Sequence, residues 1–317
     1  MMHRVLLTLA LTVALPTSAF AQAKVGTAGG QFLDLGVSAR ALGMGEVFTS
    51  IANDQTTLYY NPAGAALLTT SQGSFTGVIL PAGIMYGYAA LVVPTPSMGG
   101  AWGFSATVLD AGTMDYAPPS YPSGNGETFG ARDVMVGVTY SRFLTDQFSV
   151  GVTAKYVGEF FDDQSAHAAA FDVGTYYDTR WQNIRLGLIF SNVGSDLKLI
   201  NQTYALPVNF RFGISSDVIS DANNKLTIGV EGGHPNDNLD KASIGAEYWL
   251  QDRLAIRAGY KFNYDSDSWS VGLGGKVPMG SSTIRIDYAF TPMNLAHGAG
   301  AFDGVNMAHR FTLGMTF

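Results

Sequence analysis

Cysteine is absent from the 317 residues of this chain, and charged residues are scarce. Asp, Glu, Lys and Arg together make up 14% of the residues, well below the roughly 25% of ordinary soluble domains. A chain without cysteine forms no disulfide bond, which fits an envelope protein that does not depend on disulfide chemistry. The formal net charge of −7 gives no electrostatic reason to expect nucleic acid as a partner.

Long apolar runs are missing as well. Hydrophobic residues make up 47% of the chain. After the N-terminus, however, no run approaches the roughly 18 residues that a membrane-spanning helix needs. Apolar content without such runs indicates either a large buried sheet or a membrane barrel. The length of 317 residues suits one large domain or two ordinary ones.

The first 21 residues read as a secretion signal. Residues 1–4 form a short basic start, residues 5–15 an apolar core, and Ala19-Phe20-Ala21 matches the A-x-A cleavage pattern. A membrane anchor is the alternative, but the apolar run is too short and no stop-transfer pattern follows. We therefore predict cleavage after Ala21 and export across the inner membrane.

Alternation of apolar residues with Gly, polar or charged residues recurs from about residue 73 to the end of the chain. Examples are residues 134–140, 148–156, 226–230, 256–262 and 311–317. Period two predicts strands with one apolar and one polar face, and we count about fourteen of them. A soluble β-sandwich would show the same alternation. Export, the low charge fraction, aromatic residues at strand ends and runs of nine to eleven residues favour a transmembrane β-barrel.

Aromatic residues at the predicted strand ends fit an interfacial girdle. They are Trp102, Tyr140, Phe148, Tyr156, Tyr248, Tyr264, Trp269 and Phe290.

The connections between the predicted strands alternate in length. The segments 110–129, 159–166, 194–207, 234–240 and 291–308 read as mostly long, and those between them as short. Outer-membrane barrels keep short turns in the periplasm and longer loops outside. This pattern predicts both termini on the periplasmic side, with residues 22–70 entering the barrel from that side.

Residues 26–68 are rich in small residues and carry a conspicuous motif. Pro62 restricts Asn61 to extended or turn geometry, so we expect a sharp bend over residues 60–64, with Asn61 hydrogen-bonded locally. The segments 38–45, 53–54 and 60–64 resemble the N-terminal signature of PorV/PorQ-type outer-membrane proteins, a branch of the FadL-like family. The motif positions are Ser38, Arg40, Gly43, Gly45, Asp54, Tyr60, Asn61, Pro62, Ala63 and Gly64.

The resemblance implies an N-terminal hatch that plugs a barrel of fourteen strands in the bacterial outer membrane. It divides the chain into a signal peptide (1–21), a hatch (22–70) and a barrel (71–317). Because facing lipid would cost a charged side chain several kcal/mol near the midplane, charges inside strands are expected to face the lumen. We expect this of Lys155, Asp172, Arg185, Arg211, Glu231, Glu247, Arg257, Lys261, Arg285, Asp287 and Arg310.

Two interpretations of the inward charges remain open. They could pair with one another and with Arg40, Glu46 and Asp54 of the hatch, or they could line a path for a polar solute. Pairing is favoured, because a folded plug needs buried partners for its polar groups.

The external segments also allow alternatives. Acidic clusters at residues 162–163, 236–240 and 265–267 offer oxygen ligands for calcium, but they lack the twelve-residue loop pattern, so solvated turns are the preferred interpretation and no metal site is predicted. The loop 110–129 is rich in proline and tyrosine. It could form a rigid docking surface or a lid.

No enzyme signature is present. Residues 272–276 lack the spacing and the following helix of a phosphate-binding loop, and the histidines show neither metal spacing nor a G-x-S-x-G elbow. We expect no catalytic residues and no cofactor.

Two functions follow from the resemblance. The first, preferred on the motif match, is a PorV/PorQ-type accessory that contacts secretion-system proteins or exported cargo through its loops, as in type IX secretion. The second is a FadL-like channel that takes up a hydrophobic small molecule. Either protein would be surrounded by outer-membrane lipids.

Overall fold

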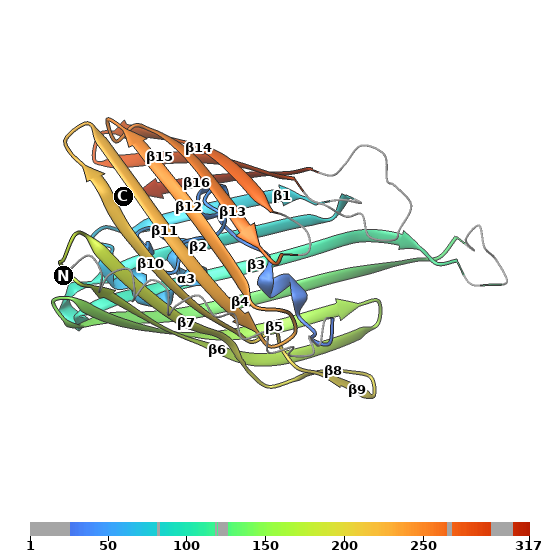
Figure 1. Cartoon of the computed structure of the whole chain (residues 1–317). Helices are drawn as coiled ribbons and strands as arrows, with labels where there is room; N and C mark the ends of the chain where they lie inside the picture. Colours follow the sequence, from blue (N-terminus) through green and yellow to red (C-terminus); the bar gives the residue numbers. More distant parts are fainter. Residues whose placement is uncertain (1–25, 81–82, 118, 120–125, 265–267, 293–306) are drawn as a thin grey trace, which may run out of the picture.

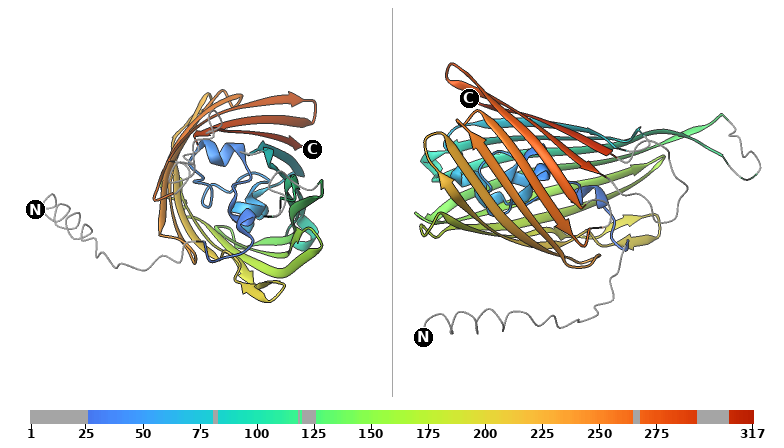
Figure 2. Two further views of the ribbon diagram at one scale, coloured as in Figure 1. Left: turned by 90° about the vertical axis from the view of Figure 1, so that its right-hand side faces the viewer. Right: turned by 45° about the horizontal axis from the view of Figure 1, so that its top comes forward.

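The computed structural model describes residues 26–80, 83–117, 119, 126–264, 268–292 and 307–317. Fourteen antiparallel strands form a closed barrel in the order β1-β16-β15-β14-β13-β12-β11-β10-β7-β6-β5-β4-β3-β2 (Figures 1 and 2). The predicted barrel of about fourteen strands is confirmed. The predicted signal peptide lies outside the described residues.

The four longest strands, of 14 to 18 residues, lie in the first half of the barrel. The first half comprises β1 (Gln72–Ile79), β2 (Met85–Thr95), β3 (Gly100–Asp115), β4 (Thr128–Thr145), β5 (Phe148–Phe161), β6 (Gln164–Asp178) and β7 (Ile184–Gly194). The second half comprises β10 (Asn209–Ser220), β11 (Asn224–Pro235), β12 (Lys241–Leu250), β13 (Leu254–Phe262), β14 (Trp269–Met279), β15 (Ser282–Pro292) and β16 (Met307–Thr316).

Strand alternation produces a barrel with an apolar exterior. Large apolar side chains stand exposed on the outer face of successive strands, among them Phe75, Phe104, Val136, Val152, Phe171, Leu188, Ile228, Ile256 and Ile286. In water this surface would be unfavourable, whereas in a bilayer it meets lipid chains. Closure pairs β1 with β16, from Gln72↔Thr316 to Val78↔Arg310, so the barrel has no open sheet edge.

None of the helices in the described part of the chain is long and apolar enough to cross a membrane.

The connections at one end of the barrel are shorter than the sequence suggested at two places. The predicted loop 159–166 is a turn at Asp162 and Asp163, because β5 and β6 pair as far as Phe161↔Gln164. The predicted loop 110–129 is partly strand, since β3 and β4 stay paired to Asp115↔Thr128 and project beyond their neighbours (Figure 1). The segment 194–207 holds a small hairpin of β8 (Leu197–Leu199) and β9 (Gln202–Tyr204).

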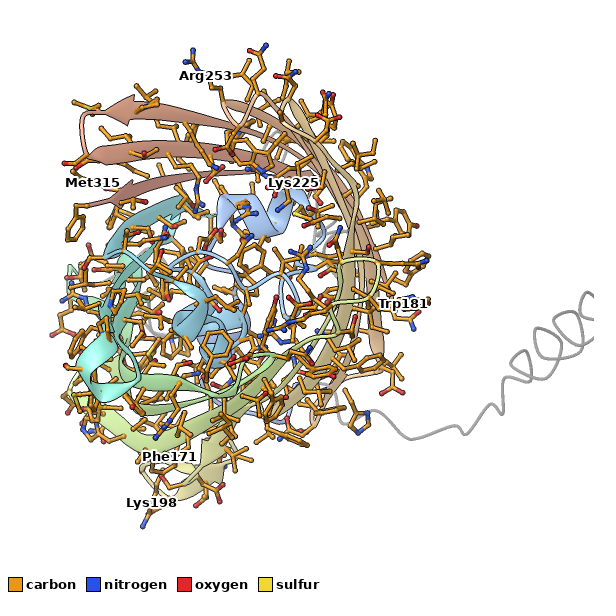
Figure 3. The ribbon with its side chains drawn as sticks, turned by 90° about the vertical axis from the view of Figure 1, so that its left-hand side faces the viewer. Phe171, Trp181, Lys198, Lys225, Arg253 and Met315 are labelled. Carbon is orange, nitrogen blue, oxygen red and sulfur yellow. The ribbon has the colours of Figure 1, made fainter. Side chains whose placement is uncertain are left out.

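The interior of the barrel is filled by the N-terminal segment. Residues 26–70 contain η1 (Gln31–Asp34), α2 (Ala39–Gly43), α3 (Thr57–Tyr60) and η2 (Pro62–Leu67). Most of residues 36–65 are buried. Figure 3, viewed along the barrel, shows these short helices and their side chains occupying the space within the ring of strands. We keep the name hatch for this segment.

Candidate functional site: the hatch and its seat in the barrel

The hatch begins at the end of the barrel that carries the long connections. The Gly29 amide donates to the Ala205 carbonyl at 2.9 Å, and the Gly30 amide donates to Glu159 Oε1 at 2.7 Å. At the opposite end, the Phe317 amide donates to the Ser71 carbonyl at 2.9 Å. The prediction that the hatch enters from the same side as the C-terminus is therefore wrong. The described chain starts at one end, passes through the lumen and reaches β1 at the other.

This error has a simple physical cause. The alternation of loop lengths indicates at which end of the barrel each strand begins. It carries no information about the path of a segment that precedes the first strand. Glu159 accepts the hydrogen bond from the Gly30 amide. The sequence pattern predicts a loop at Glu159, but in the structure this residue lies within β5, two residues before the end of the strand.

The α2 helix carries the first part of the motif. Ser38 is its N-cap, and the Ser38 side chain accepts from the Ala41 amide at 3.4 Å. The Ala39 amide donates to Thr312 Oγ1 of β16 at 2.9 Å, which attaches the start of the helix to the wall. At the end of the helix Gly45 has a φ of 64°, and its amide donates to Ser270 Oγ of β14 at 3.1 Å.

A closed ring of six alternating charges joins two hatch residues, Arg40 of α2 and Asp54, to strands β12, β13 and β15. Arg40 contacts Glu247 through two bonds of 2.7 and 2.6 Å and contacts Asp54 at 2.8 Å. Arg257 bridges Glu247 at 2.7 Å and Asp287 at 2.9 Å. Arg285 then bridges Asp287 at 2.8 Å and Asp54 at 2.9 Å. We call this group the ionic ring.

The ionic ring is neutral because it holds three guanidinium groups and three carboxylates. Asp54, Glu247, Arg257 and Asp287 have side chains at most 1% exposed. Burial alone would raise the pKa of the Asp54 carboxyl, but the guanidinium groups of Arg285 and Arg40 hold this pKa below its ordinary value. Pairing of this kind is what allows charges to remain inside the barrel.

Glu231 of β11 receives the next turn of the hatch. Its carboxylate accepts from the Phe48 amide at 3.0 Å, the Thr49 amide at 2.9 Å and Thr49 Oγ1 at 2.7 Å. Arg211 of β10 lies 3.8 Å from the same carboxylate. Lys261 of β13 pairs with Glu46 at 2.8 Å. The barrel charges thus satisfy both side chains and backbone of the hatch.

The Asn61-Pro62 step joins two short helices rather than forming an isolated bend. Asn61 is extended (φ −167°) between α3 and the 3-10 helix η2, and its Oδ1 accepts from the Ala63 amide, which is the expected local bond. Its Nδ2 also donates to the Thr49 carbonyl at 2.8 Å and the Thr175 carbonyl of β6 at 2.9 Å. The Ala63 carbonyl accepts from Ser141 and Ser149 of β4 and β5, each at 3.0 Å. Gly64 is required because a Cβ there would lie 2.2 Å from Thr57 Oγ1.

Glycine residues of the wall let the hatch backbone approach closely. A Cβ added to Gly245 would lie 2.1 Å from the Met44 carbonyl oxygen, and one added to Gly259 would lie 2.1 Å from the Gly45 nitrogen. The same crowding by the hatch occurs along successive strands at Gly151, Gly174, Gly187, Gly245, Gly259 and Gly272, which we call the glycine belt. The sequence prediction missed these residues, although they sit at the polar positions of the alternating pattern.

On the other side of the lumen the hatch meets an apolar wall. Hatch residues including Phe48, Leu58 and Tyr60 share one buried cluster with Val78, Tyr86 and Tyr88 of β1 and β2. Leu58 packs onto the backbone of Gly103 of β3. We call this contact the apolar seam. The hatch is therefore held by charges on β12–β15 and by apolar packing on β1–β3.

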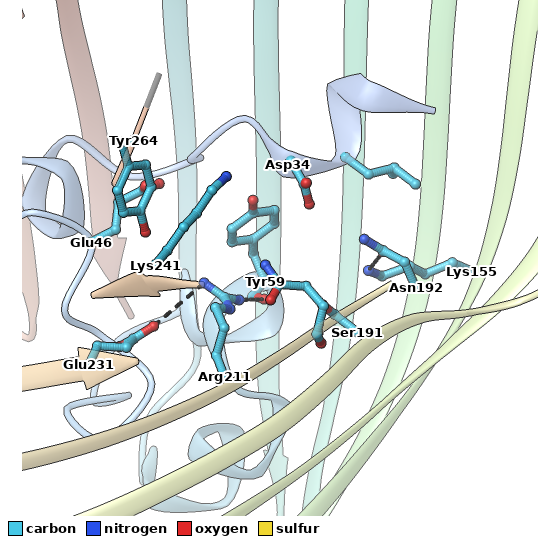
Figure 4. Close-up of a pocket in the computed structure, with 12 residues that line it drawn as sticks. Asp34, Glu46, Tyr59, Lys155, Ser191, Asn192, Arg211, Glu231, Lys241 and Tyr264 are labelled. Atoms are coloured by element: carbon cyan, nitrogen blue, oxygen red, sulfur yellow. Dashed lines mark hydrogen bonds and ion pairs between the residues drawn. The ribbon is translucent and has the colours of Figure 1, made fainter. Parts of the chain in front are cut away.

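A polar cavity of about 50 Å³ remains above the hatch and is lined by residues including Asp34, Tyr59, Lys155, Arg211, Lys241 and Tyr264. In Figure 4 the Lys241 side chain extends into the space between Tyr264 and Asp34. Burial raises the pKa of Asp34 to about 6, partly opposed by Lys241. Tyr264 was expected in the lipid interface but contributes to this cavity. The volume is far below the ~150 Å³ that holds a benzene-sized molecule.

Two further predicted charges pair with other residues of the wall rather than with the hatch. Arg185 pairs with Asp217 at 2.6 Å, and Lys155 pairs with Asp172 at 2.6 Å. His234 Nδ1, near the end of β11, lies 2.5 Å from Asp240 Oδ1 in the connection that follows. Among the described residues no group of three or more His, Cys, Asp or Glu is placed to hold a metal ion. Asp265, Asp267 and His297 fall outside those residues.

Comparisons with known proteins support the fold. A Pseudomonas aeruginosa FadL homologue superposes with a TM-score of 0.58 at 12% identity, covering 89% of this chain and 98% of that one. The Ralstonia pickettii toluene transporter TbuX gives 0.59 at 13% identity, covering 89% and 97%. The Pseudomonas putida toluene transporter TodX gives 0.58 at 13% identity, with the same coverage.

No family model matches the sequence, and no curated protein matches it. The chain has the closed fourteen-strand fold of the FadL-type outer-membrane barrels, which agrees with the predicted location in the bacterial outer membrane.

Proposed function

We propose that this protein is an outer-membrane channel for small hydrophobic molecules, closed at rest by its hatch. The observation that carries the proposal is the two-sided seating of the hatch. Ion pairs hold it on β12, β13 and β15, whereas on β1–β3 it is held by apolar packing and one neutral hydrogen bond, from Tyr86 to the Leu35 carbonyl. A displacement along the apolar seam breaks no ion pair and exposes an apolar surface.

A polar solute is a poorer substrate for this lumen. Most of the inward charges near the hatch are engaged with one another or with hatch groups, so a solute would have to replace strong buried contacts. The similar structures include two toluene transporters, which favours the hydrophobic alternative over the secretion role that the motif suggested. Transport rather than catalysis is the activity we assign.

The proposal is tested by uptake in a bacterial host that lacks its own channel for hydrophobic compounds. Expression should increase the initial uptake rate of labelled toluene or of a long-chain fatty acid, without increasing that of a sugar. A variant lacking residues 26–65 should form a barrel that conducts ions freely in planar bilayers, whereas the complete protein should not. Equal uptake with and without the protein would rule out the proposed transport.

The deletion variant is a fair test because the four wall residues of the ionic ring remain a neutral set. Without Arg40 and Asp54, the chain Glu247–Arg257–Asp287–Arg285 still alternates in sign. Near-zero conductance of the deletion variant would show that something other than residues 26–65 closes the lumen.

A PorV/PorQ-type accessory role in protein secretion is a second candidate, and one feature favours it. The β3–β4 ribbon extends beyond the last pairs that β3 makes with β2 (Met85↔Asp110) and β4 makes with β5 (Ala131↔Phe161). Its free edges could pair with an extended segment of an exported protein. If this role is correct, deleting the gene should impair surface display of exported proteins and leave uptake of hydrophobic compounds unchanged.

A further inference from the structure

The apolar seam contains two buried hydroxyl groups without a hydrogen-bond partner among the described residues, that of Tyr88 on β2 and that of Tyr60, and the second belongs to the hatch. The Tyr60 side chain is completely buried, and within the described part of the chain its hydroxyl has no hydrogen-bond partner. Buried hydroxyl groups are nearly always hydrogen-bonded, because an unmet bond costs free energy. Phenylalanine would fill the same space without this cost, so the hydroxyl needs another explanation.

The aromatic ring of Tyr60, in contrast, is well accommodated. Its centroid lies 5.3 Å from that of Phe48 and 4.8 Å from that of Tyr59, both in edge-on geometry. The Arg211 guanidinium lies 5.5 Å from the ring centroid. These contacts use the face and edge of the ring and leave the hydroxyl unused.

Tyr86, in the same seam, is a tyrosine whose hydroxyl contributes a hydrogen bond to the fold. Its hydroxyl donates to the Leu35 carbonyl at 2.9 Å and so connects β2 to the hatch. The two tyrosines share a hydrophobic cluster but differ in that one hydroxyl is used by the fold and the other is not. Tyr86 is therefore the matched control for Tyr60.

We propose that the Tyr60 hydroxyl is a specificity determinant that donates a hydrogen bond to an oxygen atom of the molecule passing through the apolar seam. The preferred ligands are then uncharged apolar molecules with one acceptor oxygen, such as a ketone or an ester, rather than pure hydrocarbons of the same size. The inference rests on the proposed transport function and adds a substrate class to it. A carboxylate is a poorer fit, because the nearby Arg211 guanidinium already faces Glu231, so the charge of the ligand would be buried without a partner of its own.

Acetophenone and ethylbenzene form a suitable probe pair, since they have similar size and differ by a carbonyl oxygen. We expect the wild-type protein to increase initial uptake of acetophenone more than that of ethylbenzene in the host described above. Tyr60→Phe should lower the acetophenone-to-ethylbenzene ratio about three- to tenfold, which corresponds to one neutral hydrogen bond. Ethylbenzene uptake and the thermal stability of the purified protein should not fall.

The control variant Tyr86→Phe should behave differently. It removes a bond that the fold uses, so it should lower the stability of the closed hatch and change the uptake of both probes alike. The inference would be overturned by an unchanged ratio in Tyr60→Phe, or by a loss of stability in Tyr60→Phe equal to that in Tyr86→Phe.

The outcomes separate the inference from the function on which it rests. Wild-type uptake of both probes above the vector control, with a ratio unaffected by Tyr60→Phe, would refute only the role of Tyr60. Wild-type uptake of neither probe, nor of toluene, would refute the channel itself and the role of Tyr60 with it.

Discussion

Arg40 is the residue on which the attachment of the hatch depends most. It contributes three of the hydrogen bonds in the ionic ring, to Glu247 and Asp54, and a fourth to Asn53 at 2.8 Å. Its guanidinium also lies 5.2 Å from the Phe48 ring centroid, where the ionic side of the hatch meets the apolar side. A buried ion pair adds little net stability when complete, but removal of one member leaves its partners as uncompensated charges.

Arg40→Met should therefore destabilise the hatch by about 3–5 kcal/mol, the range observed for broken buried pairs. Faster hydrogen exchange over residues 38–61 and a measurable ion leak in planar bilayers are the expected results. Arg132→Met is the control, because Arg132 pairs with Asp110 on the outer surface and its side chain is 61% exposed; its effect should not exceed about 1 kcal/mol. Exchange as slow as in the wild type would show that the ring does not hold the hatch.

At the scale of single elements, the strands position the hatch at glycine residues, where the wall has no side chain. The β12–β14 wall meets α2 and the following turn with glycines, so backbone contacts backbone and leaves no room for any side chain. The α2 helix has only five residues, too few to be stable alone. Its geometry is thus imposed by the Thr312 and Ser270 bonds and by the glycine belt.

Gly259→Ala tests this account. The added Cβ would lie 2.1 Å from the Gly45 nitrogen. Neither atom can move aside cheaply, because the nitrogen belongs to the hatch backbone and the position of a Cβ is fixed by its own backbone. We expect an intact barrel with a displaced hatch, seen as ion leakage and as protease sensitivity within residues 26–68. Gly275→Ala on the neighbouring strand is the control, since its nearest neighbour would be 3.9 Å away. Leakage from both variants, or from neither, would contradict the role of the glycine belt.

The alternating pattern was sufficient to predict the strands, because period two follows directly from pleated geometry. It also placed Glu247, Arg257 and Asp287 on one face, but not the connectivity of the ionic ring, which depends on strand register across β12–β15 and on the position of Arg40. Asp217, Thr312 and Ser270 were not singled out, since nothing local distinguishes them from solvated residues. Tyr264 was misplaced because a tyrosine at a strand end looks the same whether it faces lipid or the lumen.

At the scale of the whole molecule, the hatch makes the chain cross the barrel once before the strands begin. Residues 29–31 are bound to Ala205, Glu159 and Asp237 near the long connections, while Ser71 and Phe317 meet at the other end. If the long connections face outward, as in other outer-membrane barrels, the start of the hatch lies at the cell surface and the C-terminus in the periplasm. Fourteen strands alone would have left both ends on one side.

The absence of cysteine makes this arrangement testable with single substitutions. Thr27→Cys should react with a membrane-impermeant maleimide on intact cells, as should Ile200→Cys in the turn between β8 and β9, where the side chain is 66% exposed. Ala222→Cys, in the short turn between β10 and β11, should react only after the outer membrane is permeabilised. Reaction of Thr27→Cys together with Ala222→Cys, and not with Ile200→Cys, would mean that the hatch enters from the periplasm. The bonds at Gly29 and Gly30 would then not exist in the membrane.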